Sequence, residues 1–216
     1  LISNRSLCPS FLPIKKRMWN KQVYTSSSSP SSPPGSLSMC DSKYSAAEDC
    51  FRAGNVFFDQ GEYAAAVEQY SAAIADDPDL PSVWSNRGVA YGRMNDFEKS
   101  VANLNEAIRL QPTDAHHWHC RGLAYNGMGE FAMAIEDQSR AIQWEPTRAE
   151  HWDGRAVAYG GLGQFSRAIA DHSEAIRLQP SIARHWNNRG IVCGKLGDHD
   201  QAVSDYSEAI RLEPAN

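Results

Sequence analysis

The chain has 216 residues, 21 of them basic and 26 acidic, for a formal net charge of −5, and 42% of its residues are hydrophobic. This hydrophobic content is ordinary for a globular protein, so disorder of the whole chain is excluded. The acidic balance argues against binding nucleic acid by broad phosphate neutralisation. No apolar run reaches the about 18 residues that membrane insertion as a helix requires.

The first 46 residues differ in composition from the rest of the chain. Residues 26–38 read SSSSPSSPPGSLS, which lacks the apolar surface needed to offset its ordering entropy. Residues 1–46 also hold six basic side chains and one acidic one. We therefore expect a disordered, basic, Ser/Pro-rich leader. Such a composition is typical of an organelle transit peptide. The alternative is that translation starts at Met39 and that residues 1–38 carry no function.

The cysteines give a further indication of the compartment. There are five of them, widely spaced and without a CxxC pair, so a disulfide framework or a zinc site has little support. We expect a reducing, cytoplasmic location. Organelle targeting is the alternative if residues 1–38 are a genuine transit peptide.

From Ala47 to Asn216 the sequence repeats with a period of 34 residues. Tryptophan occupies position 4 in all units but the first, alanine occupies position 27 in all five, and proline occupies position 32. The period divides this region into five units: 47–80, 81–114, 115–148, 149–182 and 183–216.

Each unit has the pattern of a helical hairpin. Positions 4, 8 and 11 share one face of a first helix, and positions 20, 24 and 27 share one face of a second helix. Small residues at positions 8, 20 and 27 allow the two helices to approach closely. Turn residues such as Gly129-Glu130 lie between the helices, and the proline ends each unit.

These residues resemble the signature of the tetratricopeptide-repeat family, W-x2-L-G-x2-Y…A…F…A…P, over residues 47–216. The resemblance implies an all-α, right-handed α-solenoid of five tandem helix–turn–helix hairpins. It also implies a non-catalytic protein–protein interaction scaffold that binds a peptide segment in a concave groove built from the first helices.

The repeats depart from the family pattern at two positions. Position 7, a leucine in the family, is arginine in the last four units, and position 23 is aspartate in the last three. We predict a structural charge pair in each of these three units: Arg121–Asp137, Arg155–Asp171 and Arg189–Asp205. Position 24 is polar at Gln138 and His172. Either the second helix is locally looser there, or these residues form a functional polar seam.

We predict no metal site, cofactor or catalytic residue. His117, His151 and His185 recur once per hairpin, so their spacing prevents them from converging on one zinc ion. His116 and His119 share a helix face beside Cys120, but a fourth ligand is lacking. The sequence has no P-loop, GxSxG or HExxH motif and no predicted strand, which argues against an enzyme.

In the family, positions 2, 5, 9, 12 and 13 line the groove. Four aliphatic residues at position 9 predict an apolar line along it, and glycines at positions 12 and 13 would leave room for a ligand. The alternative is that position 9 packs against the next first helix. The candidate groove residues are Phe51, Asn55, Phe58, Ser85, Asn86, Val89, Arg93, His116, His119, Leu123, Asn126, Asp153, Val157, Arg184, Asn187, Ile191 and Lys195.

A role as a chaperone co-factor is disfavoured. In chaperone-binding relatives a carboxylate clamp holds the C-terminal tail of the chaperone. Asn55 and Asn86 match this clamp. Its three cationic positions hold Phe51, His116 and Cys120 instead, so a terminal carboxylate would lack charged hydrogen bonds.

A second alternative is the substrate-recognition arm of a larger enzyme, such as the glycosyltransferase that modifies serine with N-acetylglucosamine. Its position-6 asparagine ladder is matched only at Asn86 and Asn188. The last repeat lacks a polar capping helix, so Val203, Tyr206 and Ile210 should face water, another subunit or a continuation of the chain. The sequence does not identify the protein partner.

Overall fold

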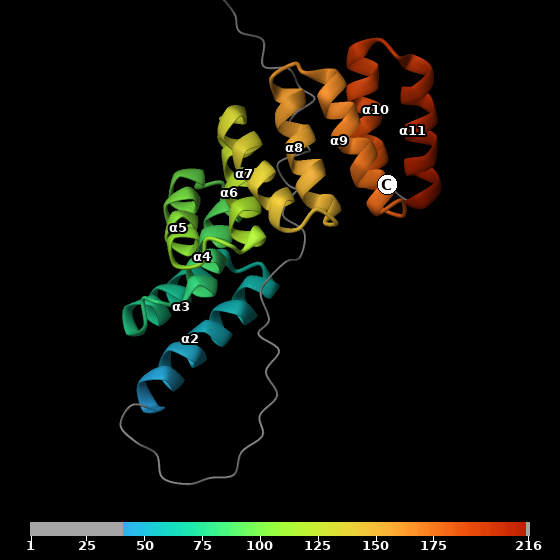
Figure 1. The fold of residues 1–216 in the computed structure, drawn as a ribbon. Coiled ribbons are helices and arrows are strands. Elements are labelled where there is room, and N and C mark those ends of the chain that lie inside the picture. Colours follow the sequence, from blue (N-terminus) through green and yellow to red (C-terminus); the bar gives the residue numbers. More distant parts are fainter. Residues whose placement is uncertain (1–40, 215–216) are drawn as a thin grey trace, which may run out of the picture.

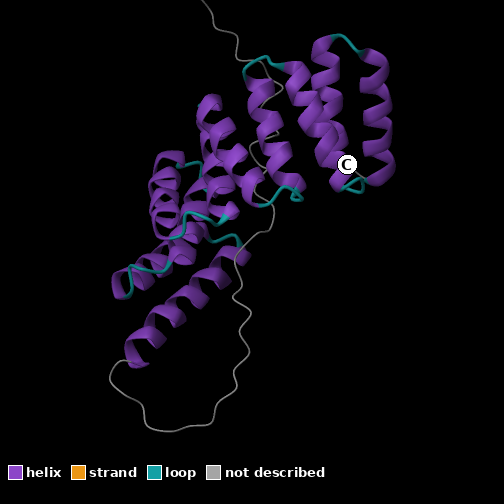
Figure 2. Ribbon diagram, in the orientation of Figure 1, coloured by secondary structure: helices purple, strands orange, loops and turns teal. Residues whose placement is uncertain are grey.

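The computed structural model describes residues 41–214, and all regular structure in this part of the chain is helical (Figure 2). Five helical hairpins follow one another along the chain (Figure 1). Their helices are α2 (Asp41–Gln60) and α3 (Tyr63–Asp76), α4 (Pro81–Arg93) and α5 (Phe97–Leu110), α6 (Ala115–Met128) and α7 (Phe131–Trp144), α8 (Ala149–Gly161) and α9 (Phe165–Leu178), and α10 (Ala183–Leu196) and α11 (His199–Leu212).

The hairpins stack side by side into the expected all-α solenoid (Figure 1). Each first helix packs against its own second helix and against the second helix of the preceding hairpin. Successive first helices also contact one another, and they do so more closely than successive second helices. The first helices therefore lie on the inner side of the curve. We call the side of α2, α4, α6, α8 and α10 that faces this inner side the inner wall.

Each first helix ends in a turn that requires a left-handed residue. Gly61, Gly129, Gly163 and Gly197 have φ angles of 83°, 85°, 73° and 91°. Asn95 takes the same place in the second hairpin with φ 62°. Glycine has no steric penalty in this conformation, and asparagine is among the non-glycine residues that tolerate it best. The chain can therefore reverse direction within a few residues.

Glycine at position 8 lets a large side chain from the second helix reach the first. A Cβ added to Gly54 would lie 2.5 Å from the Tyr70 ring, and one added to Gly122 would lie 2.8 Å from the Gln138 amide. Tyr70 and Gln138 are fully buried as a result. Position 24 is buried at the centre of each of the first four hairpins, which makes its polar residues important for the inner wall.

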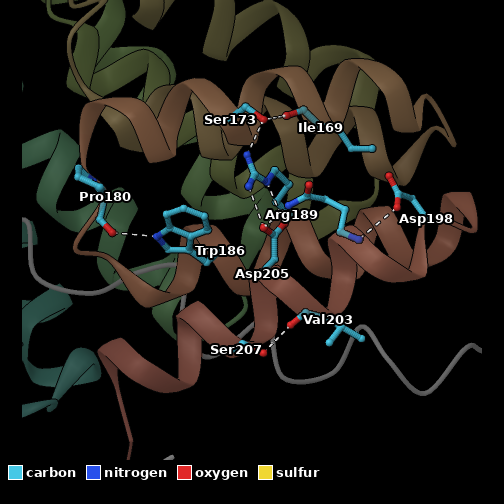
Figure 3. Close-up of polar contacts among 10 residues, drawn as sticks. Ile169, Ser173, Pro180, Trp186, Arg189, Asp198, Val203, Asp205 and Ser207 are labelled. Carbon is cyan, nitrogen blue, oxygen red and sulfur yellow. Dashed lines mark hydrogen bonds and ion pairs between the residues drawn. The ribbon is translucent and has the colours of Figure 1, made fainter.

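A single arginine joins three helices where the fourth and fifth hairpins meet, which is the last of the four junctions between hairpins (Figure 3). The Arg189 guanidinium donates two hydrogen bonds to Asp205, at 2.8 and 2.7 Å, and a third to Ser173 in the preceding hairpin at 2.9 Å. It also lies 5.2 Å from the centroid of the Trp186 ring, whose Nε1 donates to the carbonyl of Pro180 at 2.8 Å. We call this arrangement the arginine staple.

The arginine staple recurs at all four junctions between hairpins. The predicted charge pairs are confirmed, with bidentate contacts of 2.7 to 3.0 Å in the last three hairpins. Arg87 instead donates to Asn103 at 2.7 Å. The third contact, to position 25 of the preceding hairpin, was not predicted; its acceptors are Ser71, Asn105, Ser139 and Ser173.

The first helix begins earlier than the sequence predicted. α2 starts at Asp41, whereas we expected the hairpin to begin at Ala47. The prolines that separate the later hairpins have no counterpart in residues 35–46, so nothing stops the helix from extending towards the N-terminus. The rest of the predicted leader lies outside the described residues. The localisation expected from the sequence therefore stays a prediction.

The outer side of α11 is exposed, as expected. Val203, Tyr206 and Ile210 have exposed fractions of 65%, 36% and 62%. In the internal hairpins the corresponding side of the second helix packs against the next first helix.

Candidate functional site

All of the candidate groove residues lie on first helices, but at different depths. Seven are buried: Phe58, Ser85, Asn86, Val89, His119, Leu123 and Asp153. Eight are half-buried: Phe51, Asn55, Arg93, His116, Asn126, Val157, Arg184 and Ile191. Two are exposed: Asn187 and Lys195. A partner can reach the last two groups without a change in the fold.

The predicted apolar line at position 9 is wrong in its first half. Val89 and Leu123 are only 4% and 6% exposed and belong to the hydrophobic core. Successive first helices contact each other, which favours the alternative that position 9 packs inside the solenoid there. Val157 and Ile191 remain half-buried, so apolar contact with a partner is restricted to α8 and α10.

Two of the glycines at position 13 do not leave room for a ligand. A Cβ on Gly127 would lie 2.6 Å from the Phe97 ring, and one on Gly161 would lie 2.5 Å from the Phe131 ring. Each ring comes from the second helix of the preceding hairpin. These glycines therefore accommodate a core side chain, and the prediction of free space at them is wrong.

Asn55 and Asn86, which match the family's carboxylate clamp, hydrogen-bond to each other. The Asn55 Oδ1 atom accepts from the Tyr70 hydroxyl at 2.8 Å and from Asn86 Nδ2 at 2.9 Å. This network ties α2 and α3 to α4. The two asparagines therefore have a structural role at the first junction.

The polar residues at position 24 form a buried seam behind the inner wall. Gln138 is fully buried: its Oε1 lies 2.9 Å from His119 Nδ1, and its Nε2 donates to the His119 carbonyl at 3.1 Å. His172 is 1% exposed and its Nδ1 lies 3.0 Å from Asp153 Oδ1. Both side chains are tightly packed and bonded, so the hypothesis of a looser second helix is wrong.

Asp153 is the centre of this seam in the last two hairpins. Its Oδ1 atom accepts from His172 at 3.0 Å and from Asn188 Nδ2 at 3.2 Å, and it lies 3.3 Å from His185 Nδ1. Its Oδ2 atom lies 3.5 Å from Arg184 Nε. Four side chains from α9 and α10 therefore surround one carboxylate of α8.

These neighbours keep the Asp153 carboxylate ionised. Burial would raise the pKa of Asp153, but hydrogen bonds from His172 and His185 and the charge of Arg184 hold it well below its usual range. The buried negative charge in turn attracts the Arg184 guanidinium at the inner wall.

His116 and His119 on α6 and His151 on α8 lie close together. The His119 and His151 ring centroids are 4.8 Å apart. Burial, and to a smaller extent the charge of His119, lowers the pKa of His116 to about 3 and that of His151 to about 2. Within residues 41–214 no group of three or more His, Cys, Asp or Glu side chains could hold a metal ion. The lowered pKa values of all three imidazoles favour their neutral form.

Cys120 and His116 resemble a catalytic dyad in distance alone. The Cys120 Sγ atom lies 3.4 Å from His116 Nε2. Burial raises the pKa of the Cys120 thiol, and burial lowers that of the His116 imidazole. The thiol therefore stays protonated, and this pair is poorly suited to nucleophilic catalysis.

Position 2 supplies the charged side chains of the inner wall in the last two hairpins. Glu150 lies in the first turn of α8 and Arg184 in the first turn of α10, and both are half-buried. Glu150 was not among the candidate residues. His185 and Asn188 were also missed as parts of the site, whereas Gln138 and His172 had been named as one of two alternatives, a functional polar seam.

Among the described helices, none is long and apolar enough to cross a lipid bilayer.

Family models match most of the repeat region. A model described as "TPR repeat" matches residues 54–95, and models described as "Tetratricopeptide repeat" match residues 81–114, 118–148 and 183–216. Comparison with curated protein sequences gives no match.

Several solved structures share the fold. A crystal structure of MamA is 22% identical with a TM-score of 0.66, and the alignment covers 74% of this chain and 94% of that one. TTC0263, a thermophilic TPR protein in Thermus thermophilus, is 18% identical with a TM-score of 0.69, covering 79% and 93%. YrrB, described as a TPR protein with an unusual peptide-binding site, is 15% identical with a TM-score of 0.63, covering 82% and 91%.

Proposed function

This chain belongs to the tetratricopeptide-repeat family, and we propose that it is a non-catalytic interaction scaffold that binds an extended segment of a partner protein on its inner wall. The observation that carries the proposal is the composition of the wall on α8 and α10. Half-buried aliphatic side chains lie on both helices, Val157 on α8 and Ile191 on α10, and α10 adds two exposed polar ones, Asn187 and Lys195.

This mixture suits a peptide better than a second folded surface. The aliphatic side chains would take apolar anchors of an extended segment, and the polar ones would bond to its backbone and side chains. The peptide-binding site named for YrrB, which has a similar fold, adds support for this mode of binding.

Affinity purification with mass spectrometry tests the proposal. The wall variant Val157→Gln/Ile191→Gln changes two half-buried residues of first helices. The matched control, Ala170→Gln/Ser204→Gln, changes two exposed residues on the second helices of the same hairpins. Loss of captured partners in the wall variant alone, with both variants folded by circular dichroism, would support the proposal. Retention of all partners by a folded wall variant would refute it.

A further inference from the structure

Glu150 and Arg184 are opposite charges at the same position of neighbouring hairpins. Both lie in the first turn of a first helix, and α8 contacts α10. No ion pair joins the two side chains, since the Arg184 ion pair goes to Asp153 instead. Both side chains are half-buried on the inner wall, so their charges are held where a partner would lie.

The fold leaves an oxygen of Glu150 without a partner and compensates the charge of Arg184 only in part. The Oε2 atom of Glu150 is buried without a hydrogen-bond partner among the described residues. Arg184 Nε lies 3.5 Å from Asp153, too far for a strong hydrogen bond, and the arginine side chain is 28% exposed. A carboxylate taken out of water without a donor, and a guanidinium only partly compensated, both cost free energy of folding.

Helix stability does not account for the two charges either. An acid in the first turn favours a helix, but that benefit does not require Glu150 to be buried. A cation in the first turn opposes the helix dipole, so Arg184 is unfavourable where it lies. Glu48 occupies the matched position in the first hairpin, and it is exposed and paired with Arg52 at 2.6 Å. The charged residues at position 2 of the last two hairpins therefore differ from Glu48 of the first hairpin in that they are half-buried.

We propose that Glu150 and Arg184 select the partner segment, by binding a basic and an acidic side chain of the same extended peptide. This inference rests on the proposed function. Contacting helices have axes about 8–10 Å apart. In a polyproline II segment, side chains three residues apart point the same way and are separated by about 9 Å. The ligand is thus a peptide with opposite charges at i and i+3.

Asp153 fixes the geometry of the acidic half of this site. It contacts Arg184 through Nε at 3.5 Å, and because the arginine side chain is 28% exposed we expect the two terminal nitrogens of the guanidinium to face the partner. Those nitrogens can bind a carboxylate through the bidentate pair of hydrogen bonds that arginine favours. A carboxylate there also faces the N-terminal turn of α10, whose dipole attracts it.

Selection from a phage library of random 12-residue peptides tests the inference. On the unmodified chain, we expect enrichment of peptides with Lys or Arg three residues from Asp or Glu, in one fixed order. Replacing either charge of an enriched synthetic peptide with glutamine should raise its Kd about tenfold, the size expected for one charge-assisted hydrogen bond.

Two variants that each remove one charge assign the two preferences. Glu150→Gln should remove the preference for the basic residue and keep that for the acidic one, and Arg184→Gln should do the reverse. Glu48→Gln is the matched control and should keep both. The Oε2 atom of Glu150 has no hydrogen-bond partner within residues 41–214, so Glu150→Gln should fold, and it can be tested even if Arg184→Gln does not fold.

The outcomes separate this inference from the proposed function. Enriched peptides without the charge pair, or a pair preference unchanged by Glu150→Gln, would overturn the inference while leaving peptide binding intact. If no peptide is enriched and the wall variant Val157→Gln/Ile191→Gln also keeps its captured partners, the proposed function fails as well.

Discussion

Acidification should destabilise the solenoid through half-buried His116 on α6 and buried His151 on α8. Burial lowers the pKa of His116 to about 3 and that of His151 to about 2. A histidine whose pKa is lowered by folding binds more protons in the unfolded chain. Its contribution to stability is therefore complete above the unfolded pKa of about 6.5, and it is lost as the pH falls towards the folded pKa.

The magnitude follows from these pKa values. At pH 5.0 each ring is protonated in the unfolded chain and neutral in the folded one. The pH then lies about 1.5 units below the unfolded pKa, which corresponds to a loss of about 2 kcal/mol per histidine. The two histidines together should lower the free energy of unfolding by about 4 kcal/mol between pH 7.5 and pH 5.0.

Urea unfolding followed by tryptophan fluorescence measures this loss. The His116→Gln/His151→Gln variant should lose about 4 kcal/mol less than the unmodified chain over the same pH interval. His199→Gln is the control because His199 is exposed. If the double variant and the unmodified chain show the same pH dependence, the two histidines are not held neutral by burial and the reasoning is refuted.

Three further predictions concern stability and can be checked by the same unfolding assay. Arg155→Ala leaves the Asp171 carboxylate buried without its partner and should lower the free energy of unfolding by about 3–5 kcal/mol. Asp171→Asn copies the natural arginine–asparagine pair of the second hairpin and should lower it by only about 1 kcal/mol. Equal losses in the two variants would contradict the role given to the arginine staple. Gly161→Ala should lower the free energy of unfolding by about 1–3 kcal/mol because its Cβ meets a phenylalanine ring at 2.5 Å. Gly160→Ala, whose Cβ has its nearest neighbour 3.9 Å away, should leave the stability unchanged or raise it. Equal effects of the two substitutions would contradict this explanation. Asn95→Gly should stabilise the chain by up to about 1 kcal/mol by relieving a φ of 62°, and an unchanged or lower stability would count against this account.

The hairpins could be predicted from the sequence because their signals are local and repeated. The 3–4 spacing of large and small residues, the turn glycines and the closing prolines each act within a single unit. The arginine–aspartate pairs could also be predicted, because the two residues occur in the same units. Their contact with Ser173 and its equivalents could not, since that residue belongs to the preceding hairpin.

How deeply each residue of the inner wall is buried could not be predicted from its position in the repeat. Val89 and Val157 share position 9, yet Val89 is buried in the core and Val157 is half-buried. The difference depends on how closely neighbouring first helices approach, and that distance depends on side chains of several hairpins at once. The surroundings of Asp153 were missed for the same reason, because its four partners come from two other helices.

The arginine staple has a consequence for how the solenoid comes apart. One guanidinium holds the two helices of its own hairpin together and also holds the preceding hairpin (Figure 3). Separating two neighbouring hairpins therefore breaks a hydrogen bond of the same arginine that joins the two helices of the later hairpin. The loss of contacts between neighbouring hairpins is therefore coupled to the loss of contacts within a hairpin. Unfolding should then proceed cooperatively from one hairpin to the next.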